Sequence, residues 1–296
     1  LELLIATLER VRDELIPPGV VSRRDSWSVG ERLAFARRLS DGFAPGGAYA
    51  SAWEEAGPAL AEAYPGLDLA PQVGLVPIGP DPRSGLWEFS HLASGEMAER
   101  DPDGELLLEE RTGIVLVLIP GDEVWCGAQS ADPEGPNYDP GATLDEGPLV
   151  RTEIAPFFIS KFETTQGQWL ELTGLEPSVI RASADAPTLL SPVERVSYNA
   201  CLRAAYLADL RLPDSTHWER ACRAGTDTPW SFGPEREDCL GKLNIADRTA
   251  READVPWSSV DDWPEHDDGA LTHTTVGSYP PNAFGLHDMH GNVAEI

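Results

Sequence analysis

Beyond Gly225, the sequence carries little of the periodic hydrophobic pattern that marks helices and strands. Its closing stretch, Tyr279–Glu295, reads YPPNAFGLHDMHGNVAE and combines turn-forming residues with large apolar side chains. The whole chain has 27 Gly and 26 Pro, which indicates many turns, together with 9 Trp and 8 Phe, which disordered chains rarely carry. We therefore expect a chain that folds, with a C-terminal part built mainly from loops.

Residues 1–65 are predicted to form a helical N-terminal module. Apolar residues recur at helical spacing over residues 1–15, and Pro17-Pro18-Gly19 ends this pattern. Two further helices are predicted over residues 26–42 and 49–64, the last interrupted at Gly57-Pro58. No recognisable chemical group lies on these helices, so we interpret them as a packing module or a spacer between domains.

Residues 66–111 are dense in Gly, Pro and Asp and are predicted to form a turn-rich linker with short strands. Asp103-Gly104 has the composition of a hairpin turn between Arg100 and Leu106–Leu108.

From Thr112 onward, to residue 296, the pattern changes to that of a mixed domain. Ile114–Ile119 is short, aliphatic and rich in Val and Ile, as expected of a buried strand, and Phe157–Thr165 alternates as a second strand. A long polar loop separates them. Helices are predicted over residues 165–173, over residues 198–210 with Ser197 as N-cap, and from Asp214 to Gly225.

The charge balance is strongly acidic, with 50 Asp and Glu against 22 Lys and Arg and a formal net charge of −28. Such a field repels phosphates, so nucleic acid and anionic membrane surfaces are not expected partners. No apolar run approaches the roughly 20 residues that span a bilayer. Divalent cations and basic polypeptides are the partners that this charge favours, and solubility is the simpler explanation.

The N-terminal residues, LELLIATLER, carry an early acid and lack the apolar core of a signal peptide. A cytoplasmic location is therefore expected. Since the first residue is not Met, we also expect that the parent protein begins further upstream.

Four cysteines are widely spaced and form no C-x-x-C, so the pattern indicates neither a zinc site nor a redox motif. Cys201 and Cys222 fall on predicted helices among small residues and are expected to be buried thiols. Disulfide pairing stays open at this point.

A series of short motifs follows in order between Thr112 and Glu295. They are DEGP at 145–148, FFISKFETT at 157–165, PVERVSY at 192–198, RLP at 211–213, WERACRAG at 218–225, VGS at 276–278 and PPNAFGLHDMHGNV at 280–293. This ordered set resembles the formylglycine-generating enzyme family, also called the sulfatase-modifying factor family. The resemblance implies an α+β, C-type-lectin-like fold over residues 112–296, rich in loops and preceded here by the helical segment.

The resemblance also implies two structural calcium ions, which would hold loop backbone that no strand ladder satisfies. By motif, the first site takes the side chains of Asn244 and Asp268 and the carbonyl oxygens of Ile245 and Ala270. The second takes the Glu295 side chain and the carbonyl oxygens of His290, Gly291 and Val293. The alternative is that Asn244 and Asp268 merely cap turns. The neighbouring acids are expected to form a solvated face: Glu252, Asp254, Asp261, Asp262, Glu265 and Asp267.

The catalytic residues that the resemblance implies are not found in this sequence. Enzymes of the family oxidise a protein cysteine to formylglycine with a copper ion held by two thiolates, ligands that suit Cu(I). In that family the two cysteines lie C-terminal to the segment where this chain ends. Copper is therefore expected only if residues after Ile296 supply cysteines; Cys201, Cys222 and Cys239 are not expected to replace them. The family's usual ending GNVWEW is GNVAEI here, with both Trp replaced.

Histidine chemistry is not expected either. A related branch of the family uses non-haem iron bound by histidines of an added N-terminal domain, but residues 1–110 contain only His91. The pair His287 and His290 provides too few ligands for a metal. The other three histidines are expected on the surface: His217, His266 and His273.

Two functions remain open. One is a noncatalytic domain that binds a protein or peptide partner. The other is the N-terminal portion of an active copper-dependent oxidase that converts a protein cysteine to formylglycine. A pseudogene product is a third possibility. Turn-rich segments such as 66–111 lie between a protein kinase and a domain of this family in some large bacterial proteins, so a kinase is a candidate fusion partner in a longer parent chain.

Overall fold

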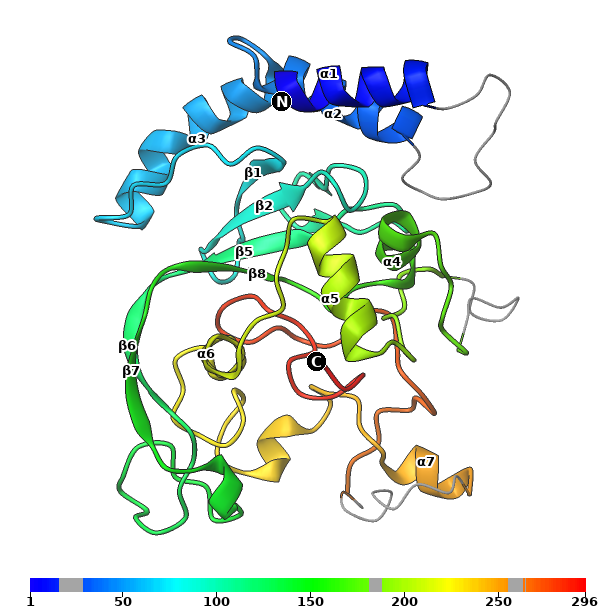
Figure 1. The fold of residues 1–296 in the computed structure, drawn as a ribbon. Coiled ribbons are helices and arrows are strands. Elements are labelled where there is room, and N and C mark those ends of the chain that lie inside the picture. Colours follow the sequence, from blue (N-terminus) through cyan, green and yellow to red (C-terminus); the bar gives the residue numbers. More distant parts are fainter. Residues whose placement is uncertain (16–28, 181–187, 255–262, 264) are drawn as a thin grey trace.

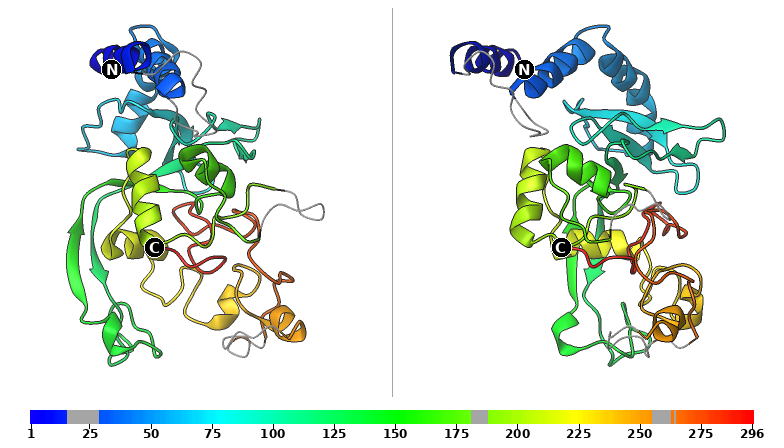
Figure 2. Two further views of the ribbon diagram at one scale, coloured as in Figure 1. Left: turned by 45° about the vertical axis from the view of Figure 1, so that its right-hand side comes forward. Right: turned by 90° about the vertical axis from the view of Figure 1, so that its right-hand side faces the viewer.

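The computed structural model describes residues 1–15, 29–180, 188–254, 263 and 265–296. Three N-terminal helices form close to their predicted positions: α1 (Glu2–Arg10), which continues as a π-helical turn over Val11–Leu15, α2 (Val29–Phe43) and α3 (Ala48–Ala63). They lie together at one end of the molecule, and the loops beyond residue 225 extend toward the other end (Figure 1 and Figure 2). No described helix is both long and apolar enough to cross a bilayer.

The predicted interruption of the third helix at Gly57-Pro58 is wrong, because α3 continues through Pro58. Trp53, Ala56 and Leu60 form a buried stripe on both sides of the proline, whose own ring is exposed. Packing along this stripe outweighs the local cost of a proline in a helix, which is about 3 kcal/mol.

An antiparallel four-stranded sheet forms the centre of the fold, in the order β1-β2-β5-β8. Its strands are β1 (Leu75–Pro80), β2 (Trp87–His91), β5 (Val115–Ile119) and β8 (Phe157–Ser160). Segment 66–111, predicted as a linker, thus supplies two strands of the same sheet as the predicted domain. Every residue of β5 is buried, as its aliphatic sequence predicts.

The two faces of β5 pack on different elements. Leu118 belongs to a cluster with Trp53 of α3, and Leu116 to a cluster with Leu172 of α4 (Gln166–Thr173). On the other face, Val117 and Ile119 pack with Ala221 of α6 (Ser215–Arg223) and with Leu286. Because successive side chains of a strand point to opposite faces, β5 connects the N-terminal helices to the C-terminal loops.

The helices of residues 165–223 begin close to their predicted starts, two of them at the predicted caps Ser197 and Asp214. Thr165, Ser197 and Asp214 each accept a hydrogen bond from a backbone N–H in the first turn of α4, α5 (Tyr198–Leu207) and α6. Helix α5 ends three residues before the predicted Leu210, because Asp209 adopts a left-handed conformation with φ of 56°.

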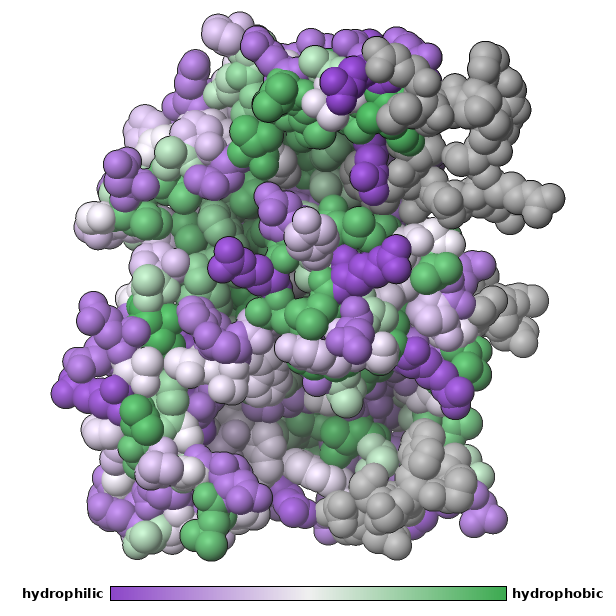
Figure 3. All heavy atoms as spheres, in the orientation of Figure 1, coloured by the Kyte–Doolittle hydropathy of each residue, from purple (hydrophilic) through white to green (hydrophobic). Residues whose placement is uncertain are grey.

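Two small sheets and three short helices complete the described part. The predicted hairpin at Asp103-Gly104 joins β3 (Glu99–Arg100) to β4 (Leu106–Leu107), and β6 (Asp122–Cys126) pairs with β7 (Val150–Ile154). The 3-10 helices η2 (Leu144–Glu146) and η3 (Arg236–Cys239) and the helix α7 (Arg248–Glu252) lie in the long loops. Hydrophilic side chains are spread over the face shown in Figure 3, as the acidic composition predicts.

Candidate functional site

Asn292 holds together three loop segments that are distant in sequence. Its backbone N–H donates to the Asn244 carbonyl at 2.8 Å, and its Oδ1 accepts from the Thr274 backbone N–H at 2.8 Å. Its Nδ2 donates to Glu163 Oε2 at 2.6 Å, just beyond β8. A Cβ at the preceding Gly291 would lie 2.2 Å from the Asn244 carbonyl oxygen, so only glycine permits this close approach. The GNV motif is therefore the point where the C-terminal loops close on the sheet.

Two acids are buried beside this junction. Glu163 accepts from Asn292 and from the Val293 backbone N–H, and burial nevertheless raises its pKa to about 8. Asp288 accepts from the Gly277 N–H at 2.8 Å, and burial raises its pKa to about 6. Within the described residues no Lys or Arg forms an ion pair with either carboxyl group. The charged forms of both groups are therefore disfavoured.

The four residues predicted for the first calcium site lie together. Asp268 accepts from the Ile245 N–H at 3.1 Å and from the Ala270 N–H at 2.7 Å, and Asn244 Nδ2 donates to the Thr272 carbonyl. In the described part of the chain no hydrogen bond ends on Asn244 Oδ1 or on the carbonyl oxygens of Ile245 and Ala270. Oxygen atoms without protein partners are what a calcium ion requires. The turn-capping alternative also fits the two bonds that Asp268 accepts.

The residues predicted for the second site surround the same junction. Glu295 accepts a hydrogen bond from the Trp218 indole N–H. The side chain of His290 accepts from the Ser231 N–H at 3.1 Å, and its burial lowers its pKa to about 4. In the described residues the carbonyl oxygens of His290, Gly291 and Val293 accept no hydrogen bond.

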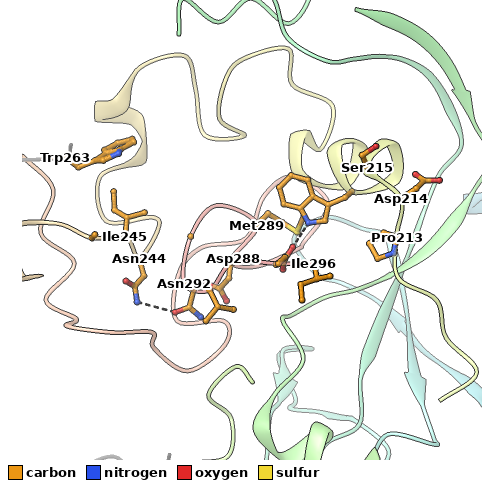
Figure 4. Close-up of a pocket in the computed structure, with 16 residues that line it drawn as sticks. Pro213, Asp214, Ser215, Asn244, Ile245, Trp263, Asp288, Met289, Asn292 and Ile296 are labelled. Atoms are coloured by element: carbon orange, nitrogen blue, oxygen red, sulfur yellow. Dashed lines mark hydrogen bonds between the residues drawn. The ribbon is translucent and has the colours of Figure 1, made fainter. Parts of the chain in front are cut away.

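A cavity of about 830 Å³ lies between the two predicted sites. Figure 4 shows Asn244 and Asn292 joined by a hydrogen bond at one wall, with Trp263 beyond them and Pro213, Asp214 and Ser215 on the opposite side. Trp218 and Trp263 give this space aromatic walls.

The prediction that His266 lies on the surface is wrong. Its exposed fraction is 1%, because its ring packs against Trp263 and its Nε2 donates to the Leu243 carbonyl at 3.0 Å. His273 is half-buried and His217 is partly exposed. Of the six acids predicted to be solvated, Asp261 and Asp262 lie outside the described residues, and the other four are exposed.

The sequence motifs did not point to Asp247, which the structure shows to be fully buried. It caps α7 by accepting from the Thr249 and Ala250 N–H groups, and its other oxygen accepts from the Asp268 N–H at 2.6 Å. The signal that could have identified it is its place directly before the helical segment RTARE, where Asp is a favoured N-cap.

The burial of His287 predicts that the stability of the fold depends on pH. Burial lowers its pKa from the ordinary 6.5 to about 4, although Nδ1 donates to the Tyr279 carbonyl at 2.8 Å. The unfolded chain therefore binds a proton that the folded chain does not, and stability should fall by about 2–3 kcal/mol as the pH drops from 6.5 to 4. Urea unfolding measured between pH 6.5 and 4 should show that the unfolding free energy of His287→Phe falls less steeply with decreasing pH than that of the wild type. The same pH dependence of the unfolding free energy in the wild type and in His287→Phe would contradict this assignment.

A comparison with known protein families shows which family the chain belongs to. The domain family described as sulfatase-modifying factor enzyme 1-like matches residues 108–296. The chain belongs to this family.

Two curated relatives are formylglycine-generating enzymes. The protein of Mycobacterium tuberculosis is 35% identical over 107 residues, and that of Thermomonospora curvata is 33% identical over 110 residues. Each match covers 35% of this chain and 32% of the relative, so the chain spans about a third of the length of the relatives it matches.

Solved structures provide two further similarities. PvdO from Pseudomonas aeruginosa aligns with a TM-score of 0.43 and 25% identity, over 67% of this chain and 72% of PvdO. Treponema denticola variable protein 1 aligns with a TM-score of 0.43 and 18% identity, over 62% of this chain and 72% of that protein.

Membership of the sulfatase-modifying factor family confirms the predicted family and the α+β, C-type-lectin-like fold class. The family motifs also explain the loop contacts. Glu219 of the WERACRAG motif accepts from the Gly127 N–H, and Arg223 donates to Glu219 at 2.7 Å, which fixes the start of the long polar loop on α6.

The cysteines of this family member are free thiols. Burial raises the pKa of Cys222 to about 12 and that of Cys239 to about 11, and it also raises the pKa values of Cys126 and Cys201. At neutral pH all four groups are therefore protonated.

Proposed function

We propose that residues 108–296 form a formylglycine-generating-enzyme-like domain that binds a protein or peptide partner and does not oxidise cysteine with these residues. The placement of the four cysteines carries this proposal. A copper-dependent oxidase of this family needs two thiolates on one Cu(I) ion. Here the four thiols lie on four different elements, in β6, α5, α6 and η3, and the group of metal-ligating side chains that clusters in the described residues contains no cysteine.

The names of the curated relatives favour an alternative. Both are formylglycine-generating enzymes, and the match covers only 32% of each. Under this alternative, the chain is the N-terminal portion of an active copper-dependent oxidase, and cysteines outside these 296 residues complete the copper site.

A peptide-oxidation assay tests the proposal. The chain would be incubated in air with Cu(I), a reductant and a cysteine-containing peptide, and the peptide would be analysed by mass spectrometry for formylglycine. The Mycobacterium tuberculosis enzyme serves as positive control. We expect conversion by the control alone. Formylglycine made by this chain, and lost in a variant with all four cysteines replaced by alanine, would overturn the proposal.

We further propose that calcium stabilises the domain through Asn244, Ile245, Asp268 and Ala270, and through His290, Gly291, Val293 and Glu295. The oxygens of these residues that lack protein partners support the first set. Calcium would neutralise the buried charge of Asp268 and crosslink two loops.

Calcium removal is therefore expected to lower the melting temperature. At a calcium concentration 100 times its Kd, binding stabilises by about 2.7 kcal/mol, or roughly 5–10 °C for a domain of this size. EDTA should remove this increment and excess calcium should restore it, as measured by calorimetry. In Asn244→Ala the calcium-induced shift should shrink, whereas Asn199→Ala, at an exposed position of α5, should keep it. An unchanged melting temperature in EDTA and in calcium would contradict the calcium proposal.

A further inference from the structure

A smaller cavity lies where segment 66–111 meets the C-terminal loops. Its volume is about 330 Å³. Its walls come from the turn after β1, the β3–β4 hairpin, the residues that follow β8 and the loop 277–281, together with His287. None of these residues belongs to either of the proposed calcium ligand sets. Cavities of about 300 Å³ and more hold small ligands in proteins.

The charged groups that line this cavity are paired with one another. Lys161 Nζ lies 2.9 Å from Asp81 Oδ1, and Arg83 Nη2 lies 3.2 Å from Glu105 Oε1. Among the described residues of the lining, two positive groups thus balance two negative groups. A charged ligand would have to break one of these pairs or remain without a counter-charge, which is costly away from water. The lining therefore favours a ligand without net charge.

The paired groups keep spare hydrogen-bonding capacity. The Lys161 ammonium has three N–H groups, and two of them bond to carboxylates in the described part of the chain. The Arg83 guanidinium bonds to Glu105 through Nε and Nη2, which leaves the N–H groups of Nη1. Carboxylate oxygens accept more than one hydrogen bond each. Since a hydroxyl group both donates and accepts, it is the ligand group that matches such a mixture of fixed donors and acceptors.

A neutral histidine and apolar side chains form the rest of the lining. His287 Nδ1 donates to the Tyr279 carbonyl at 2.8 Å, and burial lowers the pKa of the ring to about 4, so Nε2 is an acceptor at neutral pH. The imidazole stacks on Phe162 with ring centroids 4.9 Å apart. Leu106 and Leu108 add aliphatic surface. A ligand with C–H faces as well as hydroxyl groups would contact both kinds of wall.

We propose that this cavity binds a neutral polyhydroxylated molecule of the size of one sugar ring. Its carbon skeleton would lie against the leucines, and its hydroxyl groups would bond to Lys161, Arg83 and the carboxylates. The site goes beyond the proposed function, because segment 66–111 and the family domain build it together. A ligand of about a dozen non-hydrogen atoms would bind with a Kd in the millimolar range.

An NMR chemical-shift titration of the isotope-labelled full chain tests this site. The neutral probes are D-glucose, D-galactose, D-mannose, the methyl glycosides of these sugars, and myo-inositol; sodium acetate and inorganic phosphate are the charged probes. We expect at least one neutral probe to shift the backbone amide signals of Leu106, Leu108 and Gly277, and the charged probes to leave these signals unchanged.

Variants of the lining provide matched controls. Leu108→Trp fills the cavity and should weaken sugar binding by at least about tenfold, and Arg83→Ala should weaken it by about tenfold through the loss of a charged donor. Leu107→Trp introduces the same ring at the preceding position, which is 47% exposed and does not line the cavity, and it should bind as the wild type does. Near-UV circular dichroism checks that each variant is folded.

Three results would overturn the proposal. They are unchanged amide signals with every neutral probe, equal sugar binding by the wild type and a folded Leu108→Trp or Arg83→Ala variant, and tighter binding of acetate or phosphate than of any sugar. A methyl glycoside that binds as tightly as its parent sugar would identify the end of a glycan as the source of the ligand, and binding of the free sugar alone would identify a free metabolite. Both of these results support the site.

Discussion

Replacing Lys161 with alanine is expected to lower the free energy of unfolding by about 3–5 kcal/mol. Lys161 Nζ lies 2.9 Å from Asp81 Oδ1 and 2.6 Å from Glu88 Oε1, and the three side chains are at most 5% exposed. Removing the ammonium group would leave two buried carboxylates. Glu88 would keep Arg100 as a cationic partner, whereas Asp81 has no second ion pair in the described part of the chain. The cost is that of an uncompensated buried charge, which exceeds the value of a surface ion pair.

Urea unfolding measures this effect, and the chain provides a matched control. Arg83 and Glu105 also form an ion pair, but their side chains are 57% and 47% exposed, so Arg83→Ala should cost less than about 1 kcal/mol. Lys161→Met keeps most of the side-chain volume but not the charge, and should lose nearly as much stability as Lys161→Ala. Equal losses for Lys161→Ala and Arg83→Ala would show that the buried charges do not determine the effect.

The same ion pairs have a structural consequence. Lys161 follows β8 in a family motif, while Asp81 follows β1 and Glu88 lies in β2. Loss of Lys161 is therefore expected to weaken the attachment of segment 66–111 to the sulfatase-modifying factor domain.

Asn282→Ala should cost about 3–4 kcal/mol. The side chain is 7% exposed and makes four hydrogen bonds. Its Nδ2 donates to the Ala221 and Cys222 carbonyls at the end of α6, and its Oδ1 accepts from the Phe284 and Leu286 N–H groups. Alanine would leave these backbone groups buried without partners, at about 1–3 kcal/mol each before relaxation.

Thermal and urea unfolding would measure this loss against Asn199→Ala, a variant at an exposed position of α5. The control should change stability by less than about 0.5 kcal/mol. A loss of less than about 1 kcal/mol for Asn282→Ala would mean that water reaches these backbone groups after the substitution.

Elements whose causes lie within a few residues were predictable. The caps Ser197 and Asp214 accept from amides three residues ahead, and the aliphatic run of β5 is buried as its sequence predicts. The two short strands β6 and β7 show where prediction from local sequence fails. Val150–Ile154 was not predicted, because four of its five residues are not buried and it lacks an alternating pattern; among the described strands it pairs with β6.

For the candidate site, the sequence motifs identified Asn244, Asp268 and the GNV segment, and the structure brings these segments together. The burial of Asp247 and His266 was not predictable. Neither position lies in a periodic pattern, and both are covered because residues 265–268 fold back on the start of α7.

The sequence alone therefore determined the family, the capped helices, the buried central strand and the segments that form the site. Only the tertiary structure decided that segment 66–111 joins the central sheet, that Lys161 binds an acid 80 positions away, and that His266 lies in the interior. The reason is physical. Caps and strand burial depend on neighbours in the chain, whereas ion pairing and side-chain burial depend on which distant segments the closed fold brings together.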